Sequence, residues 1–248
     1  MIFHKRIWRV IVAVLFINLI GCQNTINKGE LFLPKGFVSS VYVDSIAETV
    51  RHMTVNDNGD LYVKFKKSSE AGVLAAIRDI DKNGVVDSLV KFGSYHIPQR
   101  GSYSTAARIY KGYLYFSSQL TVYRYKLNPD KLIPTGDAEI IVHDDHAHGS
   151  HEHIGKPIAF DNDGHIYVPF GAPNNACQNP KRTPMAPGQD PCPLLKDHGG
   201  IWRFDAEKIG QTQHDGEKFA SGLRSIVALD WNNSDNHLYS VIHGRDDL

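Results

Sequence analysis

Histidine and carboxylate side chains are concentrated in one short segment of the chain. Between His143 and His153 the sequence reads HDDHAHGSHEH, which places five histidines and three carboxylates within eleven residues. Such side chains can hold zinc, copper or nickel, and an imidazole can also act as a general base near neutral pH. The spacing is not that of a zinc-binding helix, because His151-Glu152 lacks a second histidine four residues after the first. We favour a solvated loop leading to one functional histidine; adventitious metal binding and a dedicated transition-metal site are the alternatives.

A second polar segment has the pattern of a calcium-binding loop. Positions 1, 3, 5, 6 and 9 of that loop are matched by Asp79, Asp81, Asn83, Gly84 and Asp87. The twelfth position is Val90 rather than glutamate, so the bidentate carboxylate of such loops is missing. A weak structural calcium site and a plain turn of Asp, Asn and Gly both remain open.

The first 22 residues read as an export signal. A basic segment over residues 1–9 precedes the apolar run VIVAVLFINLI at 10–20, which is too short for a membrane-spanning helix of about 20 residues. The following Leu-Ile-Gly-Cys22 has the form of a bacterial lipobox, so Cys22 is expected to be acylated and to anchor the protein. We expect a signal peptide over 1–22, a short linker over 23–30, and a lipoprotein of the cell envelope, on its periplasmic or outer-surface side. An ordinary signal peptide with a chance cysteine is the alternative.

Without Cys22 the chain retains one cysteine pair, Cys177 and Cys192, at the ends of a loop rich in Pro and Asn. Disulfides persist outside the cytoplasm, and such a loop has little means of packing itself. We therefore predict a Cys177–Cys192 disulfide, with two free thiols as the alternative.

The elements that must position these groups recur along the chain. A polar turn followed by an apolar, aromatic strand occurs four times, at 56–63, 110–116, 161–168 and 233–240. A short strand precedes each one, at 51–55, 106–109, 157–160 and 226–231. Further strands are expected at 121–126 and 200–204. Asn-Gly, Asp-Gly and Lys-Gly between alternating apolar residues indicate β-hairpins, because glycine accepts the positive φ of such turns.

The repeat has a period near 50 residues. Its tyrosines lie 53, 52 and 72 positions apart, and the last interval contains the loop between the cysteines; they are Tyr62, Tyr115, Tyr167 and Tyr239. A strand-rich unit of this period is typical of the four-stranded blades of a β-propeller. The sequence predicts an all-β fold with about four blades over 31–248, as the front part of a longer, truncated propeller. Trp202 and Trp231 are expected to pack between blades. An irregular β-sandwich is the alternative.

Composition excludes several classes of protein. Apolar residues make up 42% of the 248, which is typical of a globular chain. The 27 basic and 27 acidic side chains cancel, which argues against a nucleic-acid-binding protein. The chain has no P-loop, GxGxxG or GxSxG motif, so nucleotide-dependent and serine-hydrolase chemistry are not favoured.

Several segments together resemble the PQQ-dependent sugar dehydrogenases of the glucose and sorbosone dehydrogenase type. They are LPKGF at 33–37, AAIRDIDKNGVVD at 75–87, EHIGKPIAFD at 152–161, FASGLRS at 219–225 and HGRDD at 243–247. The resemblance covers residues 31–248. It implies a six-bladed propeller that carries the quinone cofactor PQQ and a calcium ion on its top face.

The resemblance also implies roles for single residues. His153 would be the general base that takes the proton of the sugar's anomeric hydroxyl while hydride passes to the quinone. Arg224 would bind the cofactor and stabilise the developing negative charge. Glu152 stands where the glucose enzymes carry an aspartate that holds substrate and orients the histidine. A salt bridge within the blade is the alternative role for Arg224.

The same resemblance assigns a metal site to the backbone. Gly244 and Arg245 would offer carbonyl oxygens to calcium, which is suitable coordination for a hard cation. Ser225 replaces an asparagine that touches the cofactor in the family. In the family, a lysine and several arginines of later blades also bind PQQ. We expect those blades to be absent from this chain.

The leading hypothesis is therefore a lipid-anchored, PQQ- and calcium-dependent dehydrogenase that oxidises an aldose or sugar aldehyde and passes electrons to an external acceptor. A non-catalytic surface propeller that binds glycan or protein is the alternative. A third hypothesis is a lactonase-like propeller that uses calcium without a quinone.

Overall fold

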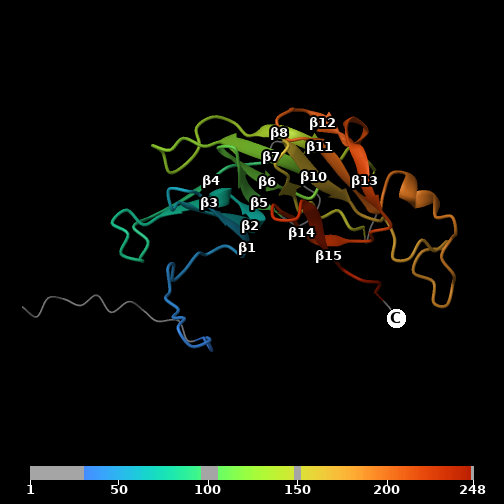
Figure 1. Ribbon diagram of the computed structural model, residues 1–248, viewed down its shortest axis with the longest axis horizontal. Helices are drawn as coiled ribbons and strands as arrows, with labels where there is room; N and C mark the ends of the chain where they lie inside the picture. The colour runs from blue at the N-terminus through green and yellow to red at the C-terminus, as the bar shows by residue number, and fades with distance from the viewer. Residues whose placement is uncertain (1–30, 96–105, 148–151, 247–248) are drawn as a thin grey trace, which may run out of the picture. The chain divides into compact units, whose positions relative to one another are not determined.

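The computed structural model describes residues 31–95, 106–147 and 152–246 of the chain. The chain divides into two compact units, one of Met1–Asp44 with Lys82–Val85 and one of Ser45–Asp81 with Val86–Leu248. In the first unit the described residues form turns, such as the one closed by the Phe37 amide on the Pro34 carbonyl at 3.1 Å. The second unit contains all the strands described below (Figure 1).

The predicted export signal, the acylated Cys22 and the linker over 23–30 lie outside the described residues. Their boundaries stay predictions. Within the described ranges, no helix has the length and apolar character needed to cross a membrane.

Antiparallel strands form four sheets in the second unit. The first sheet has the order β1-β2-β3-β4, from β1 (Val50–Val55), β2 (Leu61–Ser69), β3 (Gly72–Arg78) and β4 (Ser88–Phe92). The second has the order β12-β8-β7-β6-β5, from β5 (Ala107–Tyr110), β6 (Tyr113–Ser117), β7 (Thr121–Lys126), β8 (Glu139–His143) and the short parallel strand β12 (Gln211–Thr212). The third has the order β13-β11-β10-β9, from β9 (Ala159–Phe160), β10 (His165–Phe170), β11 (Gly200–Asp205) and β13 (Glu217–Ser221). The fourth pairs β14 (Ile226–Asn232) with β15 (His237–Ile242).

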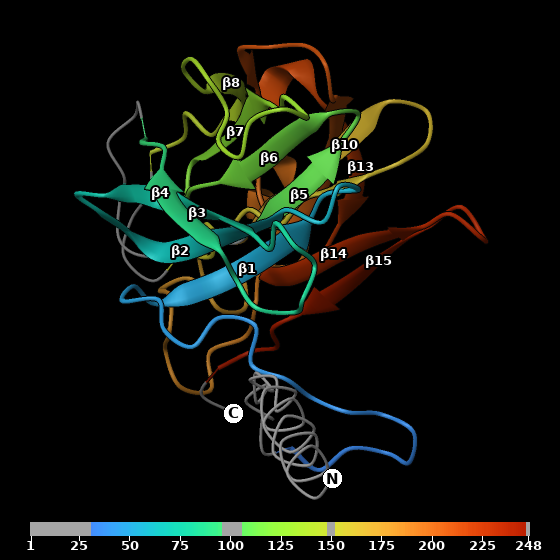
Figure 2. The ribbon, with the colours of Figure 1, turned by 90° about the vertical axis from the view of Figure 1, so that its left-hand side faces the viewer.

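The predicted hairpins are present, and each begins a sheet. Gly59 in the β1–β2 turn and Gly164 in the β9–β10 turn have φ values of +94° and +99°, which side chains with a Cβ rarely adopt. First strands of neighbouring sheets lie together in two places: β1 contacts β5 (Figure 2), and β9 contacts β14. A cavity of about 140 Å³ is lined by residues of β1, β5 and β14. The all-β prediction is confirmed, and the sheets follow each other as propeller blades do. The described residues contain no α-helix, only two short 3₁₀ turns, η1 (Pro193–Lys196) and η2 (Gln213–Asp215).

The repeated tyrosines join one blade to the next. The Tyr62 hydroxyl donates to the Leu132 carbonyl at 3.1 Å, and the Tyr115 hydroxyl donates to the Ala206 carbonyl at 2.8 Å. Both acceptors follow the third strand of the next blade. Because a buried hydroxyl needs a partner, each tyrosine fixes the spacing between two blades.

The fourth tyrosine differs from the other three. Tyr239 in β15 is 55% exposed, and its hydroxyl donates to Asp235 within its own hairpin at 2.7 Å. The Tyr167 hydroxyl also donates within its own hairpin, to the Asp161 carboxylate at 3.0 Å, but Tyr167 is buried and stacks on Trp231 of β14 with ring centroids 5.5 Å apart. Trp202 lies in a core cluster shared by the second and third sheets. The predicted inter-blade packing of Trp202 and Trp231 is therefore confirmed.

Candidate functional site

Loops from one edge of the last two sheets enclose a cavity of about 370 Å³ in the second unit. In antiparallel sheets the end of one strand and the start of the next lie at the same edge, so the segments after β10, before β11, after β13 and after β15 meet there. The residues that line it are Ala172, Asn174–Cys177, Cys192, Leu194, Leu195, His198, Gly199, Gly222–Arg224 and Ile242–Arg245. Three residues predicted to bind the cofactor or calcium, Arg224, Gly244 and Arg245, are among them, as are the two predicted disulfide cysteines.

His153 is held beside this cavity by a single backbone carbonyl. Its amide lies 3.3 Å and its Nδ1 2.6 Å from the oxygen of Ala172, a residue of the cavity wall. A carbonyl only accepts, so Nδ1 carries the proton and the neutral ring keeps its lone pair on Nε2. That tautomer suits a general base, because the free lone pair is on the nitrogen that the backbone does not use.

The pKa of His153 is lowered. Desolvation by burial is the largest cause, and the nearby guanidinium groups of Arg224 and Arg182 act in the same direction. The hydrogen bond to Ala172 and the charge of Asp246 oppose them. A lowered pKa keeps the imidazole neutral, and hence able to take a proton, at neutral pH.

Gly171 makes the close approach of His153 possible. A Cβ placed on Gly171 would collide with the backbone carbonyl oxygen of His153 and lie 2.9 Å from its Cβ. The clash is with backbone, which cannot swing away as a flexible side chain can. The glycine at the end of β10 is therefore part of what positions the histidine.

Arg224 joins the two loops that face each other across the cavity. Its Nη2 donates to the Asp246 carboxylate at 2.6 Å, its Nη1 to the Gly244 carbonyl at 2.6 Å, and its Nε to the Asn175 carbonyl at 3.2 Å. A salt bridge within the blade, the alternative role considered for Arg224, is thus present, with Asp246 as its partner. Arg182 also donates to Asp246, at 3.1 Å, so two guanidinium groups face one carboxylate.

The predicted calcium-binding backbone lies in the same network. The Gly244 carbonyl accepts from Arg224, and Arg245 is an exposed residue of the cavity wall. The Ser225 carbonyl accepts from the His243 amide at 2.8 Å and so ties the start of β14 to the loop after β15. The structure therefore brings Arg224, Ser225, Gly244 and Arg245 together, while their binding roles stay predictions.

Of the remaining histidines in the 143–153 segment, the two that the structure describes have different partners. His143 pairs with the Thr121 hydroxyl at 2.9 Å and His146 with the Asp144 carboxylate at 2.9 Å, whereas His148 and His151 lie outside the described residues. Glu152 is half-buried next to His153. Across the described ranges, three or more potential metal ligands meet only at the aspartates treated next, so a transition-metal site at these histidines gains no support there.

Three aspartates of the predicted calcium loop lie close together. Ligand oxygens of Asp79, Asp81 and Asp87 are all within 4.8 Å of one another, and Asp87 accepts from the Ile80 amide at 2.6 Å. Asn83 belongs to the first unit, where its side chain accepts from the Val85 amide at 2.9 Å. Calcium binding by this loop stays a prediction.

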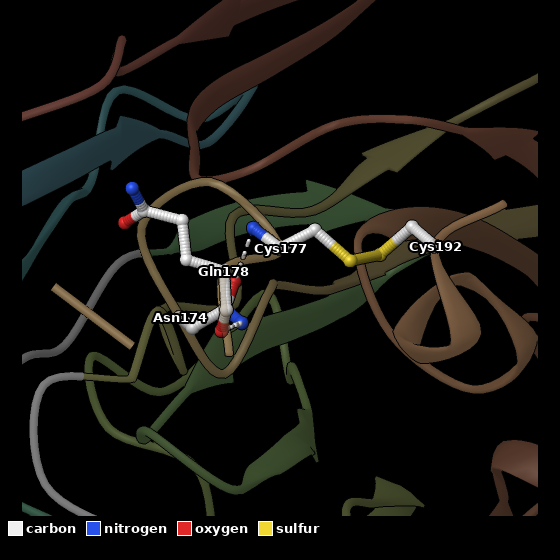
Figure 3. The surroundings of a disulfide bond; sticks show 4 residues. All are labelled: Asn174, Cys177, Gln178 and Cys192. Atoms are coloured by element: carbon white, nitrogen blue, oxygen red, sulfur yellow. Dashed lines mark hydrogen bonds between the residues drawn. A yellow bond between two sulfur atoms is a disulfide. The ribbon is translucent and has the colours of Figure 1, made fainter. Parts of the chain in front are cut away.

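The predicted Cys177–Cys192 disulfide is present (Figure 3). Both cysteines line the cavity. The loop it closes is organised from within. The Asn174 side chain accepts from the Cys177 amide at 2.8 Å, and the buried Gln178 side chain donates to the Thr183 and Ala186 carbonyls at 3.1 and 2.6 Å.

Sequence reasoning missed three residues of this network, namely Asn175, Arg182 and Asp246. Asn175 and Arg182 lie in a loop rich in Asn and Pro, where nothing distinguishes them from solvated turn residues. Asp246 belongs to the HGRDD segment already singled out, but its carboxylate was given no role. A signal was available there, because a buried arginine needs an anion.

The family follows from comparison with known proteins. The family model for glucose/sorbosone dehydrogenase matches residues 79–247, which include the whole cavity wall. The chain belongs to the glucose/sorbosone dehydrogenase family. A search among curated proteins found no match to this family member.

Solved structures with the same fold come from a pyranose dehydrogenase and from a carbohydrate-active enzyme. The holo form of the pyranose dehydrogenase PQQ domain from Coprinopsis cinerea superposes with a TM-score of 0.59 at 16% identity, over 81% of this chain and 45% of that one. A calcium structure of a Trichoderma reesei carbohydrate-active enzyme of family AA12 superposes with a TM-score of 0.62 at 16% identity. That superposition covers 84% of this chain and 49% of the other. The family member described here thus spans about half the length of these structures, and the likeness establishes the fold.

Proposed function

We propose that this family member is a PQQ- and calcium-dependent dehydrogenase that oxidises an aldose or sugar aldehyde and passes the electrons to an external acceptor. Family membership supports the reaction class. The observation that carries the proposal is the state of His153, a half-buried imidazole with a lowered pKa whose Nδ1 proton is fixed by the Ala172 carbonyl at the cavity wall.

The residues present fit a planar, anionic cofactor. At about 370 Å³ the cavity is within the size range of small-molecule sites, roughly 300–1,000 Å³. Its wall combines apolar side chains such as Leu194 and Leu223 with the guanidinium of Arg224. PQQ is a flat polycarboxylate, and the cluster of Arg182, Arg224 and Asp246 keeps an excess positive charge that suits it.

The backbone after β15 fits calcium in the type of its donors. Adjacent carbonyls of Gly244 and Arg245 are hard oxygen ligands, which calcium prefers. The Gly244 oxygen already accepts from Arg224, so a bound cation would have to share that oxygen with the guanidinium or displace the guanidinium from it. When bound, the quinone would supply a two-electron acceptor and calcium a Lewis acid.

The chain's own residues would then handle the proton and the charge. His153 would take the proton of the anomeric hydroxyl at Nε2, with the bound quinone as the acceptor for the hydride of the same carbon, and Arg224 would stabilise negative charge at the cofactor. Glu152, next to His153 in the chain, would hold a sugar hydroxyl. Ser225 would stand beside the cofactor next to Arg224.

The setting of the reaction is also part of the proposal. The signal and lipobox at residues 1–22 support an enzyme held to the cell envelope through acylated Cys22, with no other membrane contact. The Cys177–Cys192 disulfide is compatible with an oxidising compartment.

The test is a titration of the mature, full-length protein with PQQ in the presence of calcium, followed by dye reduction across a panel of sugars. Stoichiometric quinone binding with sugar-dependent dye reduction is expected. His153→Gln should keep quinone binding and lower kcat by about 10²–10⁴-fold, the usual contribution of a general base. His214→Gln, at an exposed position in η2, is the matched control.

Two results would overturn the proposal. A folded protein that binds no quinone would leave the non-catalytic propeller that binds glycan or protein. Lactone hydrolysis without any electron acceptor would favour the lactonase-like hypothesis. An unchanged rate in His153→Gln would remove His153 as the base.

A further inference from the structure

A buried asparagine from a distant part of the chain pairs with the backbone of the loop that carries Arg245 and Asp246. Asn175 lies 71 positions before Asp246 and is 5% exposed. Its Nδ2 donates to the Asp246 carbonyl at 2.8 Å, and its Oδ1 accepts from the Asp246 amide at 2.9 Å. The amide side chain thus pairs with the backbone of Asp246 at two points, as a neighbouring β-strand would.

This pairing also sets the position of Arg224. The Asn175 carbonyl accepts from Nε of Arg224 at 3.2 Å, while the Asp246 carboxylate accepts from Nη2 at 2.6 Å. The third guanidinium nitrogen donates to Gly244. Among the residues that the structure describes, every hydrogen-bond partner of the guanidinium therefore lies on Asn175 itself or on the 243–246 loop.

The position of Asn175 is in turn fixed by the disulfide-closed loop. Asn175 lies two residues before Cys177, and the neighbouring Asn174 closes a turn onto the Cys177 amide at 2.8 Å (Figure 3). The Asn174 amide also donates to the Gln178 carbonyl at 3.4 Å. Asn175 thus lies directly before a covalently closed loop, and this closure restricts the freedom of the segment that carries it.

We infer that Asn175 is the positioning residue of the cofactor site: it holds the 243–246 loop and the Arg224 guanidinium in the arrangement that receives the quinone and calcium. This inference rests on the proposed function. Asn175 needs no contact with substrate or cofactor for this role, because it acts through the Asp246 backbone and Arg224.

Only a primary amide of this length satisfies both points of the pairing. Asn175→Ala removes both hydrogen bonds. Asn175→Asp keeps the volume and the acceptor, but it places a carboxylate oxygen against the Asp246 carbonyl, where two acceptors repel. Asn233→Ala and Asn233→Asp, in the exposed β14–β15 turn, are the matched controls.

The first readout needs no cofactor. In the full-length protein without PQQ, hydrogen exchange of the segment that contains residues 243–246 should accelerate about tenfold or more in Asn175→Ala, because two half-buried hydrogen bonds are lost. The Asn233 variants should exchange as the unaltered protein does. An unchanged exchange rate in both Asn175 variants would overturn the inference.

The second readout is the affinity for PQQ at saturating calcium, which should fall about tenfold in Asn175→Ala and in Asn175→Asp. In Asn175→Asp the loss of PQQ affinity should become smaller as the pH falls from 7 to 5, because a protonated carboxyl group can again donate a hydrogen bond to the Asp246 carbonyl. Asn175→Ala has no such recovery. Arg182, Arg224, Asp246 and His243 face this pairing and are the same in all variants, so the variants are compared with each other at each pH.

The two proposals fail in different ways. If the unaltered protein binds no PQQ, the proposed function is wrong, and the exchange rates still decide whether Asn175 holds the loop. If the unaltered protein binds PQQ and the Asn175 variants bind it equally well, the positioning role is wrong and the proposed function stands.

Discussion

Removing the Cys177–Cys192 disulfide should lower the stability of the protein by a predictable amount. The two cysteines lie 15 positions apart, and the change we consider is the double variant Cys177→Ser with Cys192→Ser. A disulfide restricts the unfolded chain by an entropy of about 2.1 + 1.5R ln n cal/mol/K, where n is the length of the closed loop. For this loop the entropy is about 10 cal/mol/K, or about 3 kcal/mol at 25 °C.

That free energy corresponds to a clear shift in melting temperature. For a chain of 150–250 residues, 1 kcal/mol moves Tm by about 2–4 °C, so the double variant should melt about 6–12 °C below the unaltered protein. The assay is thermal unfolding followed by circular dichroism, with and without a reductant. The reductant should lower the Tm of the unaltered protein to that of the double variant and leave the double variant itself unchanged.

The same experiment tests whether the loop supports the cavity. Because both cysteines line it and Asn175 lies beside Cys177, the double variant should also bind PQQ more weakly. Equal melting temperatures for the oxidised unaltered protein and the double variant would refute the loop-closure reasoning. If the Tm of the double variant falls by the expected amount while its affinity for PQQ is unchanged, the link between the loop and the site is refuted.

Four further outcomes are expected. The pH profile of kcat/KM should have an acid limb centred below the ordinary imidazole value of about 6.5, because the pKa of His153 is lowered, chiefly by desolvation; a limb above 6.5 would contradict this. Gly171→Ala should cost about 1–3 kcal/mol in chemical denaturation and reduce activity, since its Cβ meets the His153 backbone; a variant with normal stability and rate would show that the site tolerates the methyl group. Burial lowers the pKa of Lys64 to about 7, so between pH 7 and about 10.5 the unfolded chain holds one proton more than the folded chain. The free energy of unfolding should therefore rise with pH over that range, by about 5 kcal/mol relative to Lys64→Met. Parallel curves of stability against pH for the two proteins would disprove this. Asp87→Asn should raise Tm in a chelator by relieving repulsion among the three carboxylates and should weaken stabilisation by added calcium; no calcium effect on either protein would leave this segment a plain turn.

Local sequence patterns were sufficient to predict most of the strands. The predicted strand at 121–126 coincides with β7, and the expected strands at 200–204 and 226–231 differ from β11 and β14 by one residue at one end. Alternating side chains and glycine turns are properties of neighbouring residues, so they can be read along the chain. The exposure of Tyr239 could not be read in this way, because burial depends on what packs against a strand and not on the strand itself.

Only some of the site residues could be predicted from the sequence. Arg224, Gly244 and Arg245 were singled out by resemblance to a family, and the structure brings them to one cavity. The carbonyl of Ala172, which fixes the His153 tautomer, has no sequence signal, since every residue has a carbonyl. Asn175 was missed for a similar reason, because an asparagine in a polar loop most often serves only its own turn.

The sequence by itself determined the strands, the turns between them, the repeat of about 50 residues and the pairing of its two later cysteines. These features depend on side-chain alternation, on glycine at positive φ and on a count of thiols, all of which are local. Only the tertiary structure decided that the loops after β10, β13 and β15 meet, and that Asn175 and Asp246 pair across 71 positions. Such pairings depend on the packing of whole blades against each other, so the same residues in the same order acquire their chemistry only once the sheets are in place.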